Sequence, residues 1–267
     1  MHMFISVIIT VRNEEKHISD LLDSLTVQEP PFEIIIVDSS SEDRTCEIVK
    51  EYMKRYTNIR LFEHGGTRGE SRNFGVKQAK GEYVAFTDGD CIANPFWLSE
   101  LRNGLKENQI VAGRTIQIGY HAFEKLERVE LVYKGSDVTY PTANIAYEKK
   151  LFEEIGGFDP WFVTAEDIDL NLRAVERGAK ITYNPKAIIY HRARESFYKF
   201  FKQAFWNGYG RKQLTVKHGK LWQNYKPTEM LKASINIWYL TRLGFAFLGY
   251  IACKLFGKTG GANKWER

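Results

Sequence analysis

The sequence predicts an α/β protein with a mostly parallel central sheet flanked by helices. Two observations support this fold class. Over residues 5–87, short apolar runs rich in β-branched residues alternate with segments whose apolar residues recur at helical spacing. The connections between them are short, and such alternation builds crossover units with parallel strands. The 267 residues suffice for one large domain, or for one domain with a small appendage.

The first 90 residues give the clearest pattern. The expected strands are apolar runs at residues 5–11, 32–37, 59–63 and 83–87. The expected helices have apolar residues three or four positions apart, and they cover residues 17–27, a segment through Ile48, Val49 and Tyr52, and residues 71–79. Asp43 or a neighbouring serine is expected to cap the second helix.

The second half is less regular. Strands are expected within residues 110–119 and at residues 180–183 and 188–190, and helices at residues 121–134 and 168–177. Between them, the segment TANIAYEKKLFEEIGG predicts a short strand, a helix through Leu151 and Ile155, and a stop at the two glycines.

Composition excludes a disordered chain, because 43% of the residues are hydrophobic and 14% are aromatic. The three cysteines, Cys46, Cys91 and Cys253, are far apart and lack zinc-site spacing. We therefore expect a reducing compartment without disulfides. The apolar run at residues 4–11 is short and has no basic leader, so we do not expect a signal peptide.

The C-terminal tail differs in charge from the rest of the chain. Residues 192–267 carry 15 lysines and arginines but three acidic residues, a net charge of +12, which with +5 overall leaves −7 elsewhere. Residues 235–253 are apolar except for Asn236, Thr241 and Arg242, and their length could cross a bilayer of roughly 30 Å. Because Arg242 is near the centre of this run, the segment could also lie in the membrane interface or pack on the body of the protein. The basic surroundings favour a membrane face over a buried helix, and the hydrophobic run argues against a role in binding nucleic acid.

Polar side chains follow the expected strands of the first half. Ligands of open parallel sheets bind beyond the carboxyl ends of the strands, so these residues are expected to surround one site. The candidates are Thr10, Arg12 and Glu14 after the first strand, Asp38 after the second, Arg68 and Arg72 at the third helix, and Asp88 and Asp90 after the fourth strand.

Asp88-Gly89-Asp90 interrupts the apolar sequence right after a buried strand. Two carboxylates this close repel one another unless a cation lies between them or one is protonated. Mg²⁺ typically binds one or two carboxylates together with substrate phosphates. The tripeptide alone is equally typical of a surface turn, but its position after a buried strand favours a binding site.

The other candidates also have two interpretations each. Asp38 could accept hydrogen bonds from a nucleobase or ribose, or cap the next helix. Arg68 and Arg72 could hold a base or a diphosphate, or be solvated surface charges. Glu166 and Asp167 could include a general base, or supply the negative charge that a helix N-terminus favours. His191 could be a metal ligand or a structural histidine.

Five motifs occur in a particular order: SVIITVRNEE, EIIIVDSSSEDRT, TRGESRNFGVKQAKGEYVAFTDGDC, GGFDPWFVTAEDIDLNLRAVERGAKITYNP and YH. In this order and spacing they resemble the family 2 glycosyltransferases of the GT-A fold, over about residues 4–195. The resemblance implies a nucleotide-diphospho-sugar transferase fold, a nucleotide-sugar donor, a divalent metal (Mn²⁺ or Mg²⁺) and inverting transfer by a single displacement.

The resemblance also implies roles by position. Thr10, Arg12, Glu14, Asp38, Arg68 and Arg72 would line the nucleotide pocket, with Asp88 against the ribose or sugar. Asp90 would bind the metal, His191 would complete the metal site, and Asp167, next to Glu166, would be the catalytic base. Asn144 and Trp161 would contact the acceptor or the sugar.

The sequence departs from the family pattern at two places. Arg12 stands where an aromatic residue usually stacks on the base, and Ser39 stands where a second aspartate is common. The chain also lacks the Gln-x-x-Arg-Trp motif of processive synthases, which favours transfer of a single sugar.

The resemblance and the tail together predict how the chain is organised. Residues 1–195 would form the GT-A domain, with a nucleotide-binding half at 1–95 and an acceptor and catalytic half at 96–195. Residues 196–267 would form a helical, membrane-associating extension with basic and aromatic residues.

The expected activity is that of a hexosyltransferase at the cytoplasmic side of the cell membrane. Its acceptor would be a polyprenyl phosphate, another lipid-linked molecule or a glycan. The alternatives are a nucleotide-sugar-binding protein without catalysis, or a transferase for a soluble saccharide.

Overall fold

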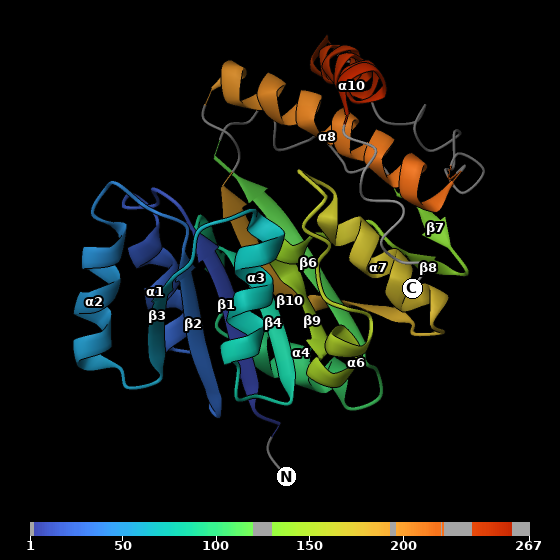
Figure 1. The fold of residues 1–267 in the computed structure, drawn as a ribbon. Coiled ribbons are helices and arrows are strands. Elements are labelled where there is room, and N and C mark those ends of the chain that lie inside the picture. Colours follow the sequence, from blue (N-terminus) through green and yellow to red (C-terminus); the bar gives the residue numbers. More distant parts are fainter. Residues whose placement is uncertain (1–2, 120–129, 193–195, 220, 222–236, 258–267) are drawn as a thin grey trace.

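A computed structural model describes residues 3–119, 130–192, 196–219, 221 and 237–257. Its centre is an eight-stranded sheet in the order β3-β2-β1-β4-β9-β6-β10-β5 (Figure 1). β1 (Ile5–Val11) pairs in parallel with β2 (Phe32–Asp38) and β4 (Tyr83–Asp88), and β3 (Ile59–Glu63) pairs in parallel with β2. The four strands expected in the first half are therefore confirmed to within a residue, and so is their parallel arrangement.

Two strands, β9 and β5, run antiparallel to their neighbours in the sheet. β9 (Ile145–Glu148) lies between β4 and β6 (Ile110–Ile118) and is antiparallel to both. β10 (Ile181–Arg192) is parallel to β6, and the short β5 (Cys91–Ala93) is antiparallel to β10. The sheet is thus mostly parallel, as expected.

One expectation for the second half is wrong, and a second is wrong at its C-terminal end. The two strands expected at residues 180–183 and 188–190 form the single strand β10, with an irregularity between Asn184 and Ile188. Pro185 lies within this irregularity and has no N–H group to donate, so the pairing is interrupted without ending the strand.

The helix expected at residues 121–134 is the second case. Its first nine residues lie outside the described part of the chain, but at its end β7 (Val132–Tyr133) pairs with β8 (Ser136–Asp137). Lys134 and Gly135 have φ of 45° and 80°, so a tight two-residue turn replaces the end of the helix.

The helices cover both faces of the sheet (Figure 1). α1 (Ile18–Thr26), α2 (Thr45–Arg55) and α4 (Trp97–Leu105) pack with the strands into one hydrophobic core. α3 (Arg68–Gln78), α6 (Lys149–Glu154) and α7 (Glu166–Glu176) pack into the other. The N-cap residue of α2 is Arg44, whose side chain makes no cap bond, but the preceding Asp43 carboxylate accepts a 3.0 Å hydrogen bond from the N–H of Thr45, the first residue of the helix.

Two long helices lie above the carboxyl ends of the strands, at the top of Figure 1. α8 (Phe197–His218) and α10 (Ile237–Phe256) run side by side in the same direction: Phe197 stacks on Trp238, and Phe201 stacks on Phe245. The backbones approach very closely, because a Cβ on Gly208 would lie 1.7 Å from the Ala246 carbonyl oxygen. The segment Trp238–Phe256 is long and apolar enough to cross a membrane, and only 17% of it is buried in the protein.

Buried ion pairs attach α8 to α7. Lys217 Nζ lies 2.7 Å from both Asp159 Oδ2 and Asp169 Oδ1, and His218 Nε2 lies 2.8 Å from Asp169 Oδ1. Asp169 is completely buried and also pairs with Arg173 on its own helix. The C-terminal helices therefore rest on the part of the molecule that carries Glu166 and Asp167.

The three cysteines are all within the described residues and all are free thiols, so the expectation that the chain has no disulfide holds.

Candidate active site

The register of the sheet brings the ends of three strands together. Val11 of β1 is opposite Asp38 of β2, and Thr10 of β1 is opposite Asp88 of β4. Because paired strands lie about 4.8 Å apart, Thr10, Asp38 and Asp88 line one edge of the sheet. This is the edge at which the sequence predicts a site.

The loops after β1 and β2 are tied to each other. The Asn13 N–H donates to Ser41 Oγ (2.9 Å), and the Glu14 N–H donates to Thr45 Oγ1 (2.8 Å). Asn13 and Ser40 have φ of 57° and 61°, left-handed values that are unfavourable for residues other than glycine. Such backbone conformations concentrate at functional sites, where the surrounding structure holds them. Arg12, in the same loop, is exposed.

Asp38 is 2% exposed and holds the turn that follows it. Its carboxylate accepts hydrogen bonds from the Ser41 N–H (2.9 Å) and the Ser41 hydroxyl (2.5 Å). Asp38 thus stabilises the turn between β2 and α2, as a helix cap would. It also lies at the edge of the sheet where the site is predicted.

Arg72 joins the two halves of the site. It is 1% exposed; its Nη2 lies 2.8 Å from Asp88 Oδ1, and its Nη1 lies 2.8 Å from Glu166 Oε1. These two carboxylates come from β4 and α7, which are far apart in the sequence. Sequence reasoning placed Arg72 in the nucleotide pocket, whereas in the structure its guanidinium lies beneath the surface and fixes two acidic side chains.

Arg68 is the exposed counterpart of Arg72, one turn earlier on α3. It follows Thr67, whose hydroxyl accepts from the Glu70 N–H while Glu70 Oε2 accepts from the Thr67 N–H, a reciprocal capping box. Desolvation would lower the pKa of Arg68, but the charges of Asp88, Glu166, Asp167 and Asp90 outweigh it and raise that pKa. The four carboxylates and Arg68 therefore share one electrostatic environment.

Asp88 lies in the same environment, where the positive charges act on its carboxyl group. Burial would raise the pKa of its carboxyl group, but the positive charges of Arg72 and Arg68 lower it below its usual value. Asp88 is therefore ionised at neutral pH.

Asp167 lies in the first turn of α7. Ala165, just before the helix, has a left-handed φ of 64°, so the chain turns sharply into Glu166 and Asp167. Burial, followed by the negative charge of Glu166, raises the pKa of Asp167 to about 6. A carboxylate with this pKa is largely ionised at pH 7 yet basic enough to accept a proton from a substrate.

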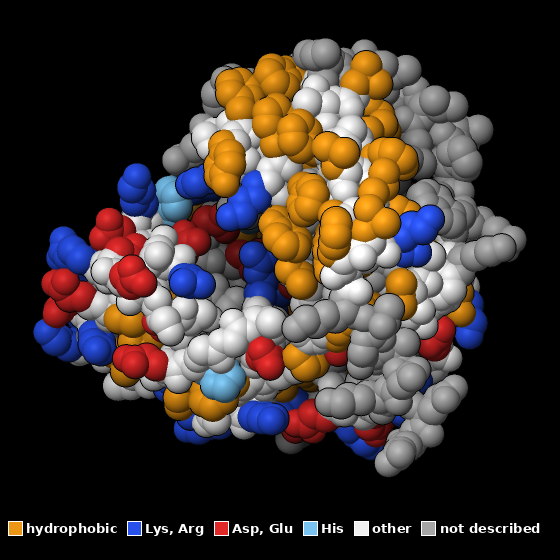
Figure 2. All heavy atoms as spheres, turned by 45° about the horizontal axis from the view of Figure 1, so that its top comes forward, with side chains coloured by type: hydrophobic (Ala, Val, Ile, Leu, Met, Phe, Trp, Pro, Cys, Tyr) orange, Lys and Arg blue, Asp and Glu red, His pale blue; other side chains and the backbone are white. Residues whose placement is uncertain are grey.

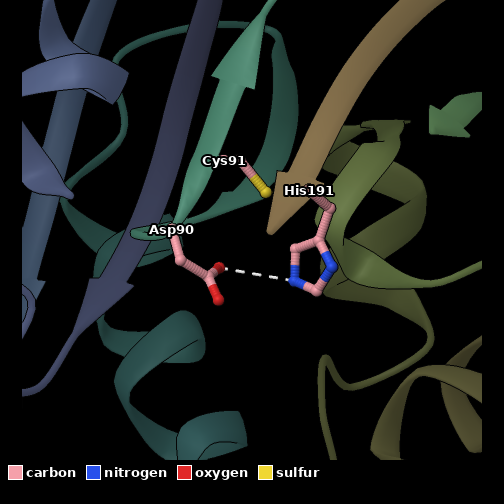
Figure 3. Close-up of side chains that lie close together, drawn as sticks. All are labelled: Asp90, Cys91 and His191. Carbon is pink, nitrogen blue, oxygen red and sulfur yellow. Dashed lines mark ion pairs between the residues drawn. The ribbon is translucent and has the colours of Figure 1, made fainter. Parts of the chain in front are cut away.

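Asp90, Cys91 and His191 form the one group of three potential metal ligands in the described residues (Figure 3). The pairing of β10 with β5 places His191 opposite Cys91, and His191 Nε2 lies 3.3 Å from Asp90 Oδ1. His191 Nδ1 lies 3.2 Å from Gln117 Oε1. If Nδ1 carries the proton and donates to Gln117, the lone pair of Nε2 is available to a cation that also binds the Asp90 carboxylate.

This donor set fits a hard divalent cation. The carboxylate suits Mn²⁺ or Mg²⁺, and the imidazole is a better ligand for the transition metal Mn²⁺ than for Mg²⁺; the remaining positions would be open to phosphate oxygens and water. Burial raises the pKa of the Cys91 thiol well above its ordinary value, so the sulfur stays protonated and is a poor ligand. Asp90 and His191 are the residues that fit the metal.

The two predicted acceptor residues have different surroundings. Asn144 is completely buried: its Oδ1 accepts from Trp97 Nε1 (2.8 Å), and its Nδ2 donates to the carbonyl oxygens of Arg114 and Ala187. It therefore joins strands in the core and does not reach the edge of the sheet. Trp161 is half-buried in the loop before α7, where Gln213 of α8 donates to its carbonyl oxygen (2.8 Å).

Sequence reasoning missed three residues that shape this site. Gln117 orients His191, and Asn73 holds the backbone of Phe158 through two hydrogen bonds of 2.7 and 2.8 Å. Arg211 of α8 lies close enough to affect the titration of Asp167. Asn73 directly follows Arg72 and could have been suspected, but Gln117 and Arg211 carry no local signal.

Two family profiles match this chain. Residues 6–159 match the profile of glycosyl transferase family 2, and residues 122–255 match that of glycosyl transferase family group 2. The glycosyltransferase AglE of Haloferax volcanii is 29% identical over 79% of this chain and 74% of its own length. A dolichyl N-acetyl-alpha-D-glucosaminyl phosphate glucuronosyltransferase of Methanococcus voltae is 26% identical over 92% of this chain and 79% of its own.

Some relatives are much longer than this chain. The poly(ribitol-phosphate) beta-glucosyltransferase of Bacillus spizizenii is 42% identical, but over 40% of this chain and 18% of its own length.

Solved structures share the fold. The Pyrobaculum calidifontis mannosyltransferase PcManGT, solved with GDP-Man and Mn²⁺, superposes with a TM-score of 0.66 at 20% identity, covering 95% of this chain and 76% of that one. Staphylococcus aureus TarS with UDP-GlcNAc gives 0.62 at 22% identity, covering 92% and 81%. These likenesses support the predicted GT-A architecture.

Proposed function

Because the chain belongs to glycosyl transferase family 2, we propose that it transfers a single sugar from a nucleoside-diphosphate sugar to an acceptor, with inversion at the anomeric carbon. The observation that carries this proposal is the grouping of Asp88, Asp90 and Asp167 around Arg68, with His191 beside Asp90 and with Arg72 pairing Asp88 to Glu166, the neighbour of Asp167.

The donor would bind over the ends of β1, β2 and β4. Thr10, Arg12, Glu14 and Asp38 would surround the nucleoside, and the ionised Asp88 would accept from ribose or sugar hydroxyls; the pairing that sets Thr10, Asp38 and Asp88 at one edge of the sheet supports this. Arg68 is exposed on the same side and can reach the diphosphate. The positive charge of Arg72 is neutralised by Asp88 and Glu166, so Arg72 would orient these groups rather than bind the nucleotide.

Asp90 and His191 would hold Mn²⁺ or Mg²⁺. When bound, such an ion neutralises the charge that develops on the departing diphosphate. Support comes from the fit of the donor set and, by analogy of fold, from the Mn²⁺ in the mannosyltransferase structure.

Asp167 would be the general base for a hydroxyl acceptor. Its carboxylate takes the proton as the acceptor oxygen bonds to the anomeric carbon, and the bond from that carbon to the diphosphate breaks, the nucleoside diphosphate leaving with the electron pair. Attack from the face opposite the leaving group inverts the configuration. The raised pKa of about 6 supports this role.

The acceptor would be lipid-linked, with the protein at the cytoplasmic membrane surface. Two relatives are named for a dolichyl phosphate-linked sugar and for poly(ribitol-phosphate), which supports a lipid-linked or polymeric acceptor. The apolar helix α10 runs alongside α8, which is attached to α7 by ion pairs, so we expect α10 to lie in the membrane interface rather than span it. A hexose is the expected sugar.

Hydrolysis of the donor by water tests this function without knowledge of the acceptor. UDP-, GDP- and dTDP-sugars would be screened with Mn²⁺ for thermal stabilisation of the protein and for release of sugar. We expect stabilisation by one nucleotide class and slow hydrolysis. Asp90→Asn should weaken metal-dependent nucleotide binding, whereas Asp167→Asn should abolish hydrolysis and retain binding; Glu176→Gln, an exposed carboxylate at the end of α7, is the matched control.

Two outcomes would contradict the proposal. Nucleotide binding with no turnover, even when membrane extract or soluble saccharides are added as acceptors, would favour a binding protein. Full turnover in both variants would refute the site assignment.

A further inference from the structure

α8 touches α10 on one side and, on the other, the loop of residues 159–164, which we call the pre-α7 loop. The residues that touch α10 include Phe201 and Gly208. Those that touch the loop are spaced three or four apart, so they share one side of the helix: Gly210, Gln213 and Lys217. Figure 2 shows the hydrophobic side chains over the region of α8 and α10 next to a hollow with acidic side chains inside it. α8 therefore lies between α10 and the chain that leads into the site.

Gln213 bonds to the backbone of the pre-α7 loop through both ends of its carboxamide. The side chain is 3% exposed. Its Nε2 donates to the carbonyl oxygen of Trp161 (2.8 Å), and its Oε1 accepts from the N–H of Val163 (3.3 Å). Because Gln213 is buried, release of the loop would leave its carboxamide without these two bonds in the interior, which costs free energy. Gln213 therefore favours one conformation of the loop.

The pre-α7 loop is also held by α8 at its first and last residues. Lys217 Nζ lies 2.7 Å from Asp159 Oδ2, while Asp159 Oδ1 accepts from the N–H of Trp161 (3.0 Å). At the other end, a Cβ on Gly210 would lie 2.6 Å from the carbonyl oxygen of Thr164, so the two backbones are in close contact. α8 thus contacts the loop at both ends and in the middle.

The pre-α7 loop leads directly into the candidate base. Ala165 follows Thr164 with a φ of 64°, and Glu166 and Asp167 then begin α7. This left-handed conformation is unfavourable for alanine and persists where the surrounding structure holds it. A loop that is fixed on α8 up to Thr164 also fixes the turn at Ala165, and that turn sets the direction in which Asp167 points.

We propose that Gln213 is a positioning residue for the transfer reaction: it binds the pre-α7 loop to α8 and so keeps the carboxylate of Asp167 oriented to accept a proton. The inference rests on the proposed function, because it concerns how the base of that reaction is placed. Gln213 would touch neither the donor nor the acceptor. Its loss should slow the chemical step and leave nucleotide binding, over the ends of β1, β2 and β4, almost unchanged.

Gln213→Met tests the inference, because methionine has a side chain of similar length but no N–H group to donate and only a weakly accepting sulfur. The substrate is the UDP-, GDP- or dTDP-sugar that the wild type hydrolyses with Mn²⁺. We expect kcat to fall about ten- to a hundredfold, as when a catalytic group is slightly displaced. The dissociation constant of the corresponding nucleoside diphosphate should change less than twofold. Gln203→Met, at an exposed glutamine of the same helix, should change neither quantity.

Gly210→Ala disturbs the same loop by a different route. The added Cβ would lie 2.6 Å from the carbonyl oxygen of Thr164, so the loop must move, whereas alanine favours the helix itself. We expect the same result, a lower kcat with unchanged nucleotide affinity. Amide hydrogen exchange over residues 160–167 should become faster in Gln213→Met and Gly210→Ala but not in Gln203→Met, as expected if the loop loosens.

Three results would overturn the inference. Unchanged kcat in both Gln213→Met and Gly210→Ala would show that these contacts do not place the base. An equal fall in Gln203→Met would show that the effect is not specific to the loop. A loss of nucleotide affinity in parallel with kcat would show that Gln213 supports the whole site and not the base in particular.

Hydrogen exchange separates this inference from the proposed function. If the wild type neither binds nor hydrolyses any of these nucleotide sugars, the proposed function fails. Faster exchange over residues 160–167 in Gln213→Met would then still support the attachment of the loop to α8 through Gln213, and unchanged exchange would overturn that attachment as well.

Discussion

Arg68 and Arg72 lie one helical turn apart on α3 but in different surroundings. Arg68 is exposed and faces the carboxylates from the open side of the site, whereas Arg72 is buried between Asp88 and Glu166. Removing one partner of a buried ion pair leaves an uncompensated charge in the interior. Loss of Arg72 should therefore affect the stability of the fold, and loss of Arg68 should affect ligand binding.

We predict that Arg72→Met lowers the free energy of unfolding by about 3–5 kcal/mol, because Asp88 and Glu166 lose their shared cation. Arg68→Met should change it by about 0.5 kcal/mol or less, as for most surface substitutions, but should raise the dissociation constant of the nucleotide. Urea unfolding and nucleotide titration of both variants measure these effects. Equal loss of stability in the two would contradict the assignment of Arg72 as a buried positioning residue.

The raised pKa of Asp167 predicts the pH dependence of the reaction. A general base acts in its ionised form, so donor hydrolysis should fall about tenfold per pH unit as the pH drops below about 6 and level off above it. Asp169, two residues away, has a pKa lowered to about 2, largely by its bond to His218 against the effect of burial, and stays ionised throughout this range. A rate that does not change between pH 5 and 7 would exclude Asp167 as the base.

At the scale of elements, the first half of the fold could be predicted because each strand and helix has its own local pattern. β1 and β3 have the bounds expected from their apolar runs alone. α4 was not predicted, although Leu98, Leu101 and Leu105 have helical spacing. The strands expected at residues 180–183 and 188–190 are a single strand, β10, because the pairing with β6 resumes beyond Pro185, which the local pattern does not show.

The candidate site was predictable in part, for a related reason. That parallel strands end at one edge follows from the fold class, so Asp38, Asp88 and Asp90 could be placed together. Burial could not be read from the sequence: Arg72 looks like a ligand-binding cation, and Asn144 like a polar contact. Both are set in the interior by segments far along the chain.

The contact between α8 and α10 depends on glycine. We predict that Gly208→Ala displaces α10, because its Cβ would lie 1.7 Å from the Ala246 carbonyl oxygen. Amide hydrogen exchange across residues 238–256 should then become faster. Gly244→Ala on α10 is the control, since a Cβ there meets nothing within 4 Å and alanine favours a helix by about 1 kcal/mol. Equal exchange in the two variants would contradict the close helix contact.

At the scale of the whole molecule, one face differs from the others in hydrophobicity and charge. α8 and α10 bring apolar side chains and a basic sequence to the side of the molecule above the active site, while the remainder of the chain is acidic overall. An anionic membrane would attract this face and repel the rest, which orients the protein as well as binding it.

We predict that the protein co-sediments with vesicles of phosphatidylcholine and phosphatidylglycerol, and less so as salt is raised. Phe247→Asp on α10 should reduce the bound fraction strongly. Val27→Asp is the matched control, because Val27 is 65% exposed and Phe247 is 64% exposed, but Val27 follows α1 rather than belonging to this face. Equal binding by the two variants would show that α10 does not contact the membrane.

The contacts between α8 and the segment around α7 limit recombination between related enzymes, because the C-terminal helices of one enzyme would have to match the catalytic half of another. Asp159 and Asp169 are buried carboxylates whose partners on α8, Lys217 and His218, come from the far end of that helix. A chimaera that joins this catalytic half to the C-terminal helices of a relative would remove the partner that α8 supplies to Asp159 and leave Asp169 with Arg173 alone among the residues that the structure describes. Recombination at the start of α8 would therefore be selected against, unless the loop before α7, α7 itself and α8 are inherited as one block.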